Sequence, residues 1–165
     1  MDRYAILMAG GAGLRLWPFS REKKPKQFIS ADGCRCMMLR TIERISPAVP
    51  LSNCFVVTNR NLAAMTEDAL KGVIPASNLI VEPERKNTAA CIAYSTFTLK
   101  SKGKDGVLCF FPADGYVKDQ TAYRLAVKQA CEAAEKTDGA RYHRHYAELS
   151  RHRLWIYSCR PRAGK

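Results

Sequence analysis

The chain has 165 residues, of which 47% are hydrophobic and 25% are charged, and its formal net charge is +12. This composition is typical of a soluble globular protein and excludes disordered, collagen-like and disulfide-rich miniprotein classes. No stretch is apolar and long enough to cross a bilayer, and Met1–Gly11 lacks the features of a secretory signal. We therefore expect a cytoplasmic protein with no membrane partner.

Apolar strand-like runs alternate along the chain with segments of helical periodicity. The predicted strands are Tyr4–Met8, Cys54–Thr58, Leu79–Val81 and Val107–Phe111. The predicted helices are Met37–Ile45, Asn61–Leu70, Thr88–Lys100 and Gln120–Lys136, with Asn59 or Asn61 and Asn87 as N-cap residues. This alternation indicates an α/β fold, a mainly parallel sheet with helices on both faces. Ligands of such sheets bind at the carboxyl ends of the strands, so residues that follow strands are the candidates for a functional site.

A glycine-rich turn follows the first predicted strand. Gly10, Gly11 and Gly13 allow the backbone to bend tightly and to present N–H groups to phosphate oxygens, and Arg15 and Lys26 add positive charge. The Gly-Lys-Ser/Thr of a P-loop is absent, and so is the third glycine of the dinucleotide-binding fingerprint. A plain turn remains an alternative, although it does not require the basic residues that follow at short spacing.

This segment resembles the signature G-G-x-G-x-R-L-x-P, with a downstream P-K, of the sugar-phosphate nucleotidylyltransferases. The matching residues are Gly10, Gly11, Gly13, Arg15, Leu16, Pro18, Pro25 and Lys26. Trp17 and the pair Gln27-Phe28 are similar to the mannose-1-phosphate guanylyltransferases within that family. The resemblance implies a Rossmann-like nucleotide-diphospho-sugar transferase fold.

Two further segments after predicted strands are similar to the same family. Glu82, Asn87 and Thr88 match an E-P-x-x-x-N-T-A segment, which the resemblance places in the nucleotide pocket near guanine and ribose. Ordinary helix capping is the alternative role for Asn87 and Thr88. Asp114 matches the metal-binding Asp of a P-[SA]-D-H segment, with Gly115 in the place of the family's His.

The resemblance implies a nucleotidyltransferase that makes GDP-mannose and pyrophosphate from GTP and mannose 1-phosphate. Arg15 and Lys26 would be catalytic through their positive charge, and Asp114 would hold Mg²⁺ against the phosphates. The implied nucleotide-binding residues are Ala9, Gly10, Gly11, Gly13, Glu82, Asn87 and Thr88. The oligomeric state is not predicted.

Two alternatives to this function stay open from the sequence. A thymidylyl- or uridylyltransferase of the same family would differ in the nucleotide that it selects. A non-catalytic nucleic-acid-binding protein would use the net charge of +12. Half of that excess charge, however, belongs to residues 140–165, and therefore we predict small anionic ligands and no nucleic acid.

The composition changes after Gly139, and the resemblance covers residues 1–139 alone. The tail, residues 140–165, contains all three histidines and has no family counterpart in this reading frame. Back-translated and read from the second base, its codons permit a family-like continuation that ends in Gly-Tyr-Gly-Tyr-Ile. We therefore expect 1–139 to be the nucleotide-binding part of a truncated domain and 140–165 to be an out-of-frame tail. A metal pair of His143 and His145, or RNA binding by the tail, is the alternative.

Truncation would have two consequences for this chain. Loss of the family's later strands would leave an apolar sheet edge uncovered, which predicts aggregation. Loss of the sugar site predicts weak activity or none. The seven cysteines form no metal-ligating or redox spacing, so we interpret them as reduced structural thiols.

Overall fold

The computed structural model describes residues 1–11, 20–21, 25–30, 33–136, 140–144 and 153–159, and for the last two ranges the backbone alone. The strands in these ranges form one sheet in the order β3-β2-β1-β4-β6-β5. They are β1 (Arg3–Met8), β2 (Cys54–Asn59), β3 (Leu79–Glu82), β4 (Gly106–Pro112), β5 (Ala140–Arg144) and β6 (Arg153–Cys159). The α-helices are α1 (Met37–Ile45), α2 (Ala63–Leu70), α3 (Asn87–Ser101) and α4 (Gln120–Lys136). The strands and helices predicted for residues 4–136 are thus confirmed, with small shifts of their ends.

The first four strands are parallel and in direct register around β1. Ile6 of β1 lies opposite Phe55 of β2 and Phe110 of β4, and Val57 of β2 lies opposite Ile80 of β3. Every residue from Cys54 to Thr58 is buried, as expected for a parallel strand that is covered on both faces. The carboxyl ends of β1, β2, β3 and β4 therefore meet at one end of the sheet.

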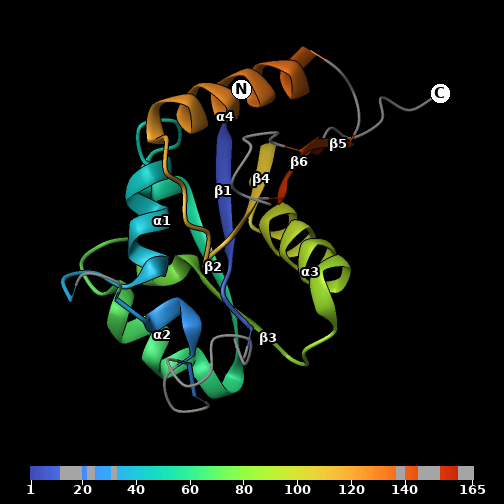
Figure 1. Cartoon of the computed structure of the whole chain (residues 1–165). Helices are drawn as coiled ribbons and strands as arrows, with labels where there is room; N and C mark the ends of the chain where they lie inside the picture. Colours follow the sequence, from blue (N-terminus) through green and yellow to red (C-terminus); the bar gives the residue numbers. More distant parts are fainter. Residues whose placement is uncertain (12–19, 22–24, 31–32, 137–139, 145–152, 160–165) are drawn as a thin grey trace.

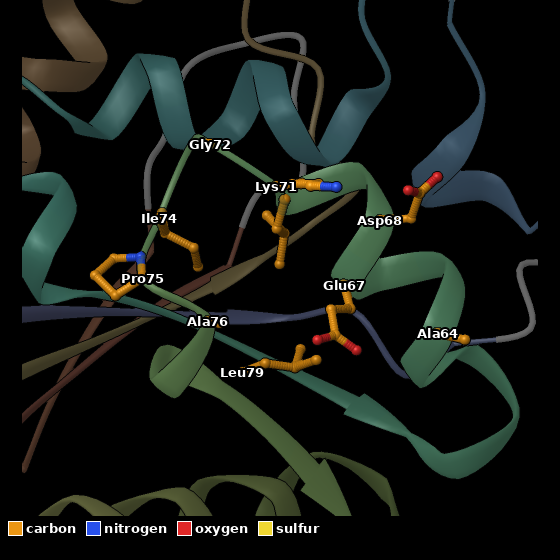
Figure 2. A pocket seen from close by; sticks show the side chains of 10 residues that line it. Ala64, Glu67, Asp68, Lys71, Gly72, Ile74, Pro75, Ala76 and Leu79 are labelled. Atoms are coloured by element: carbon orange, nitrogen blue, oxygen red, sulfur yellow. The ribbon is translucent and has the colours of Figure 1, made fainter.

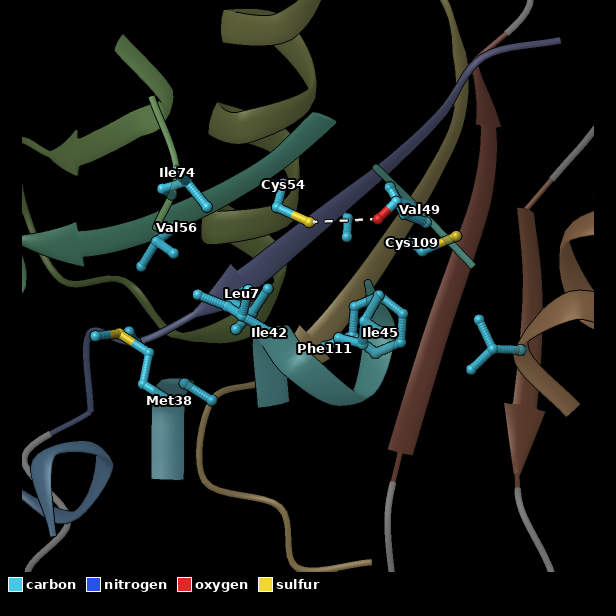
Figure 3. Packing of buried hydrophobic residues seen from close by; sticks show 14 of the residues in the cluster. Leu7, Met38, Ile42, Ile45, Val49, Cys54, Val56, Ile74, Cys109 and Phe111 are labelled. Carbon is cyan, nitrogen blue, oxygen red and sulfur yellow. Dashed lines mark hydrogen bonds between the residues drawn. The ribbon is translucent and has the colours of Figure 1, made fainter. Parts of the chain in front are cut away.

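Alternate residues of the parallel strands enter two separate cores, one on each face of the sheet. Ala5 and Leu7 face the larger core, to which α4 contributes side chains such as Val127. In that core Leu7 lies among Met38, Ile42 and Ile45 of α1 (Figure 3). Tyr4 and Ile6 face the smaller core. That core is closed by Cys91 and Leu99 of α3, which lies on the opposite side of the sheet from α1 and α4 (Figure 1). Helices on both faces confirm the predicted α/β class.

The tail contributes two strands that were not predicted. Strand β6 pairs antiparallel with β4, for example Cys109 with Ile156, and β5 pairs antiparallel with β6. The segment of β6 contains Leu154, Trp155, Ile156 and Tyr157, residue types that favour extended structure. The outer edge of β4 is therefore paired, and the expectation of an uncovered edge there is wrong.

Within the described residues, three short 3-10 turns directly precede β2, α2 and β3, and a fourth follows Pro25. They are η2 (Lys26–Phe28), η3 (Leu51–Asn53), η4 (Arg60–Leu62) and η5 (Ala76–Asn78). Asn59 caps η4, because its side chain accepts a hydrogen bond from the backbone N–H of Leu62. Among the helices in the described residues, none has the length and apolar character that crossing a membrane requires.

Candidate functional site

The turns after β1 and β4 lie side by side at the carboxyl end of the sheet. Ala9 N–H donates to Val57 O at 2.8 Å, so the pairing of β1 with β2 extends one residue beyond the strand. Ala113 N–H donates to Met8 O at 3.3 Å, which extends the pairing of β4 with β1 in the same way. The glycine-rich turn and the Asp114 turn therefore start from adjacent, fixed positions.

The described part of the glycine-rich turn, Ala9–Gly11, is held by side chains from two other segments. The side-chain amide of Gln27 donates to Ala9 O at 2.7 Å, and that of Asn59 donates to Gly10 O at 3.0 Å. A Cβ atom at position 10 would lie 3.3 Å from Oε2 of Glu82, so a glycine fits the close approach of this carboxylate. Gly13 and Arg15, which the sequence places in the same turn, lie outside the described residues.

Glu82, the last residue of the edge strand β3, carries a buried carboxylate at this end of the sheet. Its side chain is hydrogen-bonded to the Cys91 thiol, and only 6% of the residue is exposed. Burial raises the pKa of Glu82, while the Cys91 hydrogen bond and the charge of Arg85 oppose that rise. Burial, followed by the charge of Glu82, raises the pKa of Cys91 to about 12, so this thiol is protonated and serves as a donor.

A cavity of about 250 Å³ opens between the glycine-rich turn and the start of α3. It is lined by Met8, Gly10, Gly11, Glu82, Arg85, Asn87, Thr88, Cys91 and Pro112. A second cavity of about 680 Å³ adjoins it, because Glu82 and Arg85 line both, and it extends toward Asn59 and Arg60. The structure thus brings five of the predicted site residues, Gly10, Gly11, Glu82, Asn87 and Thr88, to the lining of one cavity.

The predicted N-cap role of Asn87 is wrong, because Lys86 is the N-cap residue of α3 and makes no side-chain capping hydrogen bond. Asn87 is instead the first residue of the helix, with a φ of 63°. Asparagine tolerates this left-handed conformation better than most residues. Its side chain is therefore not used for capping and lines the cavity together with Thr88.

Lys26 and Asp114 form an ion pair beside the glycine-rich turn. Nζ of Lys26 lies 3.0 Å from Oδ2 of Asp114, and 42% of the Asp114 side chain is exposed to solvent. Arg44 of α1 holds the backbone of the Asp114 turn, because its guanidinium donates a hydrogen bond to Gly115 O at 3.2 Å. The same guanidinium stacks over the ring of Tyr123. Burial lowers the pKa of the Arg44 guanidinium, which nevertheless stays protonated.

The described residues contain no cluster of three or more side chains able to hold a metal ion by themselves. Asp114 is a single accessible carboxylate, and a single carboxylate together with substrate phosphates is an ordinary ligand set for Mg²⁺. The donor set therefore fits a cation that arrives with a nucleotide better than a resident metal.

A further cavity, of about 500 Å³, is lined by none of the predicted site residues that the structure describes. It is formed by α2 and the segment that leads into β3, and its lining includes Glu67, Asp68, Leu70, Lys71, Ile74 and Leu79 (Figure 2). Leu79 is the first residue of β3, whereas the candidate site follows the last residue of that strand. This cavity is consequently a separate feature of the molecule.

Sequence reasoning missed four residues that shape the site. Gln27 and Asn59 hold the glycine-rich turn, Arg44 holds the Asp114 turn, and Cys91 contacts Glu82. A polar residue directly after the Pro25-Lys26 pair and an Asn at the carboxyl end of a strand were the available signals for the first two. Arg44 and Cys91 lie in helices, where sequence gives no indication of these partners.

Comparison with known proteins identifies the family. Residues 4–151 match the model of the nucleotidyl transferase family, and the chain belongs to that family. It is 37% identical over 132 residues to a putative mannose-1-phosphate guanylyltransferase of Vibrio cholerae, an alignment that covers 79% of this chain and 28% of the relative. It is 35% identical over 136 residues to the mannose-1-phosphate guanylyltransferase RfbM of Salmonella typhimurium, which covers 81% of this chain and 28% of that protein.

Solved structures agree with the fold. A crystal structure from Thermus thermophilus, described as a mannose-1-phosphate geranyltransferase, superposes with a TM-score of 0.74 at 27% identity. The superposition covers 96% of this chain and 58% of the other. The sheet therefore has the Rossmann-like arrangement of nucleotide-sugar transferases, as predicted. The chain spans less than a third of the length of these two curated relatives.

Proposed function

We propose that this chain binds GTP at the carboxyl end of its sheet and represents the nucleotide-binding part of a mannose-1-phosphate guanylyltransferase. The observation that carries the proposal is the juxtaposition of three groups. These are the glycine-rich turn, the buried carboxylate of Glu82 and the Lys26–Asp114 ion pair. Two curated relatives with this name, at 37% and 35% identity, support the same nucleotide and sugar.

In the proposed reaction, an oxygen of the mannose 1-phosphate phosphate group forms a bond to the α-phosphorus of GTP. The bond from that phosphorus to the bridging oxygen breaks, and pyrophosphate leaves. Gly10 and Gly11 hold phosphate oxygens through their backbone N–H groups, and Arg15 neutralises the triphosphate, with Gly13 completing the turn. Ala9 supports the turn, because its own N–H and C=O are already hydrogen-bonded within the protein.

Asp114 and Lys26 have complementary proposed roles beside the phosphates. Asp114 would hold a Mg²⁺ ion, which neutralises phosphate charge when it is bound. Lys26 releases Asp114 on nucleotide binding and keeps its ammonium group near the phosphate oxygens. Glu82 accepts hydrogen bonds from guanine, which carries more than one N–H donor, while Asn87 and Thr88 line the pocket around base and ribose.

Localisation and the state of this chain follow the same proposal. Five cysteines, Cys36, Cys54, Cys91, Cys109 and Cys131, take part in no disulfide, which is typical of the reducing cytoplasm, where we place the protein. We further propose that residues 140–165 are translated out of frame, supported by the family-like continuation in the second reading frame. Sequencing the gene across codons 139 and 140 tests this, and an intact in-frame gene with no family-like sequence in the second frame would contradict it.

The test of the function is equilibrium binding of GTP to the full chain with and without Mg²⁺. We expect GTP to bind more tightly than dTTP, UTP or CTP, and Mg²⁺ to strengthen its binding. Asp114→Asn should reduce that strengthening by about 10-fold, the size of one lost charge-assisted contact. Asp105→Asn is the matched control, because Asp105 is exposed and precedes β4 at the other end of the sheet. Steeply salt-dependent RNA binding without selective GTP binding would contradict the proposal.

A further inference from the structure

Two side-chain amides hold consecutive carbonyl groups of the glycine-rich turn. Gln27 Nε2 donates to Ala9 O at 2.7 Å, and Asn59 Nδ2 donates to Gly10 O at 3.0 Å. The donors come from segments that are far apart in sequence, η2 and the end of β2, and they reach the turn just where β1 ends. The turn therefore does not rely on glycine flexibility alone for its conformation.

Each amide is itself fixed by its surroundings. The Oδ1 atom of Asn59 accepts from Leu62 N–H at 3.1 Å, so its Nδ2 atom must be the one that faces Gly10 O. Gln27 is 3% exposed and follows Lys26 directly within η2, which links the glycine-rich turn to the Lys26–Asp114 ion pair. Asn59 is thus held through both atoms of its amide and Gln27 by burial, so both side chains are able to impose an orientation on the backbone that they contact.

Because the peptide bond is planar, a hydrogen bond that holds a carbonyl oxygen also fixes the direction of the next N–H group. In a trans peptide, the C=O of one residue and the N–H of the next lie in the same plane and point in opposite directions within it. When Gln27 holds Ala9 O, the N–H of Gly10 is directed away from Gln27. When Asn59 holds Gly10 O, the N–H of Gly11 is directed away from Asn59. Both glycines line the cavity of about 250 Å³.

We infer that Gln27 and Asn59 are positioning residues that orient the Gly10 and Gly11 N–H groups toward the phosphates of the nucleotide. This inference rests on the proposed function. It extends that function from the backbone N–H groups that contact the ligand to the side-chain amides that orient those N–H groups. Glu82 contacts the turn from a third side, because a Cβ atom at position 10 would lie 3.3 Å from its Oε2 and would require that side chain to shift by a few tenths of an ångström.

The amino end of the sheet offers a matched control with the same chemistry. Asn78, which is 6% exposed, donates from its side-chain amide to Ser52 O at 2.8 Å and to Cys54 O at 2.9 Å. Asn53 similarly donates to Arg3 O at 3.2 Å. These amides also satisfy backbone carbonyls, yet they lie before the strands and line neither cavity of the candidate site.

The experiment removes each amide with a neutral side chain of similar size, so that no charge is added near the phosphates. The variants are Gln27→Met and Asn59→Leu, with Asn78→Leu as control and Asn53→Leu as a second control if the first does not fold. Binding of GTP with Mg²⁺ and of guanosine is measured for each folded variant. Guanosine lacks phosphates, so the ratio of the two affinities reports on the phosphate contacts alone.

We expect Gln27→Met and Asn59→Leu each to weaken GTP binding by about 10-fold, as for one lost hydrogen bond, and to change guanosine binding by less than about 2-fold. The control variants should lower the melting temperature and leave the ratio unchanged. An unchanged ratio in folded Gln27→Met and Asn59→Leu, or an equal change in the controls, would overturn the inference.

A second readout separates this inference from the proposed function. If the unsubstituted chain does not bind GTP, the proposed function fails, and amide hydrogen exchange of Gly10 and Gly11 then decides the inference without a ligand. Exchange that is at least about 10-fold faster in Asn59→Leu or Gln27→Met, but not in Asn78→Leu, supports it. Equal exchange in all four proteins overturns it.

Discussion

The two ends of the parallel sheet use the same hydrogen bond for different purposes. At the amino end, the amides of Asn78 and Asn53 tie the starts of neighbouring strands to one another. At the carboxyl end, the amides of Gln27 and Asn59 hold a turn whose glycines line a cavity. The type of contact therefore does not distinguish support from function, whereas its position relative to the strand ends does.

Packing and charge show the same contrast. At the amino end, Gly106 lies against the backbone of Asp2, and Arg3 forms a two-point hydrogen-bonded pair with Glu135 of α4. At the carboxyl end, Glu82 is buried with a raised pKa, and the Lys26–Asp114 pair is accessible to solvent. The contacts at the amino end stabilise the fold. At the carboxyl end the buried carboxylate of Glu82 lowers stability, and a role in ligand binding explains why it is present.

The largest effect that we expect comes from Gly106→Ala at the amino end. A Cβ atom there would lie 2.2 Å from Asp2 O, so the backbone must move, and we expect a loss of about 3 kcal/mol in the free energy of unfolding. Chemical denaturation measures it. Gly103→Ala is the control, since its φ of +68° is strained for alanine but the space around it is open. Equal losses in both variants would contradict the clash.

Glu82→Gln tests whether the buried carboxylate at the carboxyl end lowers the stability of the fold while it contributes to GTP binding. Burial raises the pKa of Glu82 in the folded state above its ordinary value of 4.5. The protonated carboxyl therefore contributes fully to the stability of the fold below pH 4.5, and this contribution is lost as the pH rises through the raised pKa. We therefore expect Glu82→Gln to be more stable than the unsubstituted chain at pH 7, by up to about 1 kcal/mol, and equal to it in acid. Denaturation between pH 4 and 7, together with GTP binding, provides the measurement.

Two results would contradict this account of Glu82. One is a Glu82→Gln variant that is less stable than the unsubstituted chain at pH 7 and regains its stability in acid. The other is unchanged GTP binding in the folded variant. Glu84→Gln is the control, because Glu84 is exposed and follows the same strand by two residues.

The smallest effect comes from Glu135→Gln at the amino end. The hydrogen bond from Arg3 lowers the pKa of Glu135 below its ordinary value of 4.5. The Arg3–Glu135 pair therefore contributes to the stability of the fold above pH 4.5, and this contribution is lost as the pH falls through the lowered pKa. Because the pair is partly exposed, we expect a loss of no more than about 1 kcal/mol at pH 7. Glu132→Gln, in a longer exposed pair with Lys128, should change less in the same unfolding measurement.

Most strands and helices of residues 4–136 could be predicted from the sequence, because a buried parallel strand appears there as a continuous run of apolar residues. The glycine-rich turn, Glu82 and Asp114 were identifiable because each directly follows such a run. The support for these residues was not predictable. Gln27 and Asn59 act through contacts with distant segments, and the first residue of α3 departs from the usual capping pattern because Asn87 is left-handed. The pairing of β6 with β4 likewise depends on tertiary structure rather than on local pattern.

The central claim is that a guanine nucleotide binds at the carboxyl end of the sheet. A titration of the isotopically labelled chain with GTP and Mg²⁺, followed by amide NMR shifts, tests it most directly. We predict shift changes at Gly10, Gly11, Glu82 and Thr88, and none in the α2 cavity around Lys71 and Ile74. Changes confined to the α2 cavity, or no changes at saturating GTP, would contradict the claim.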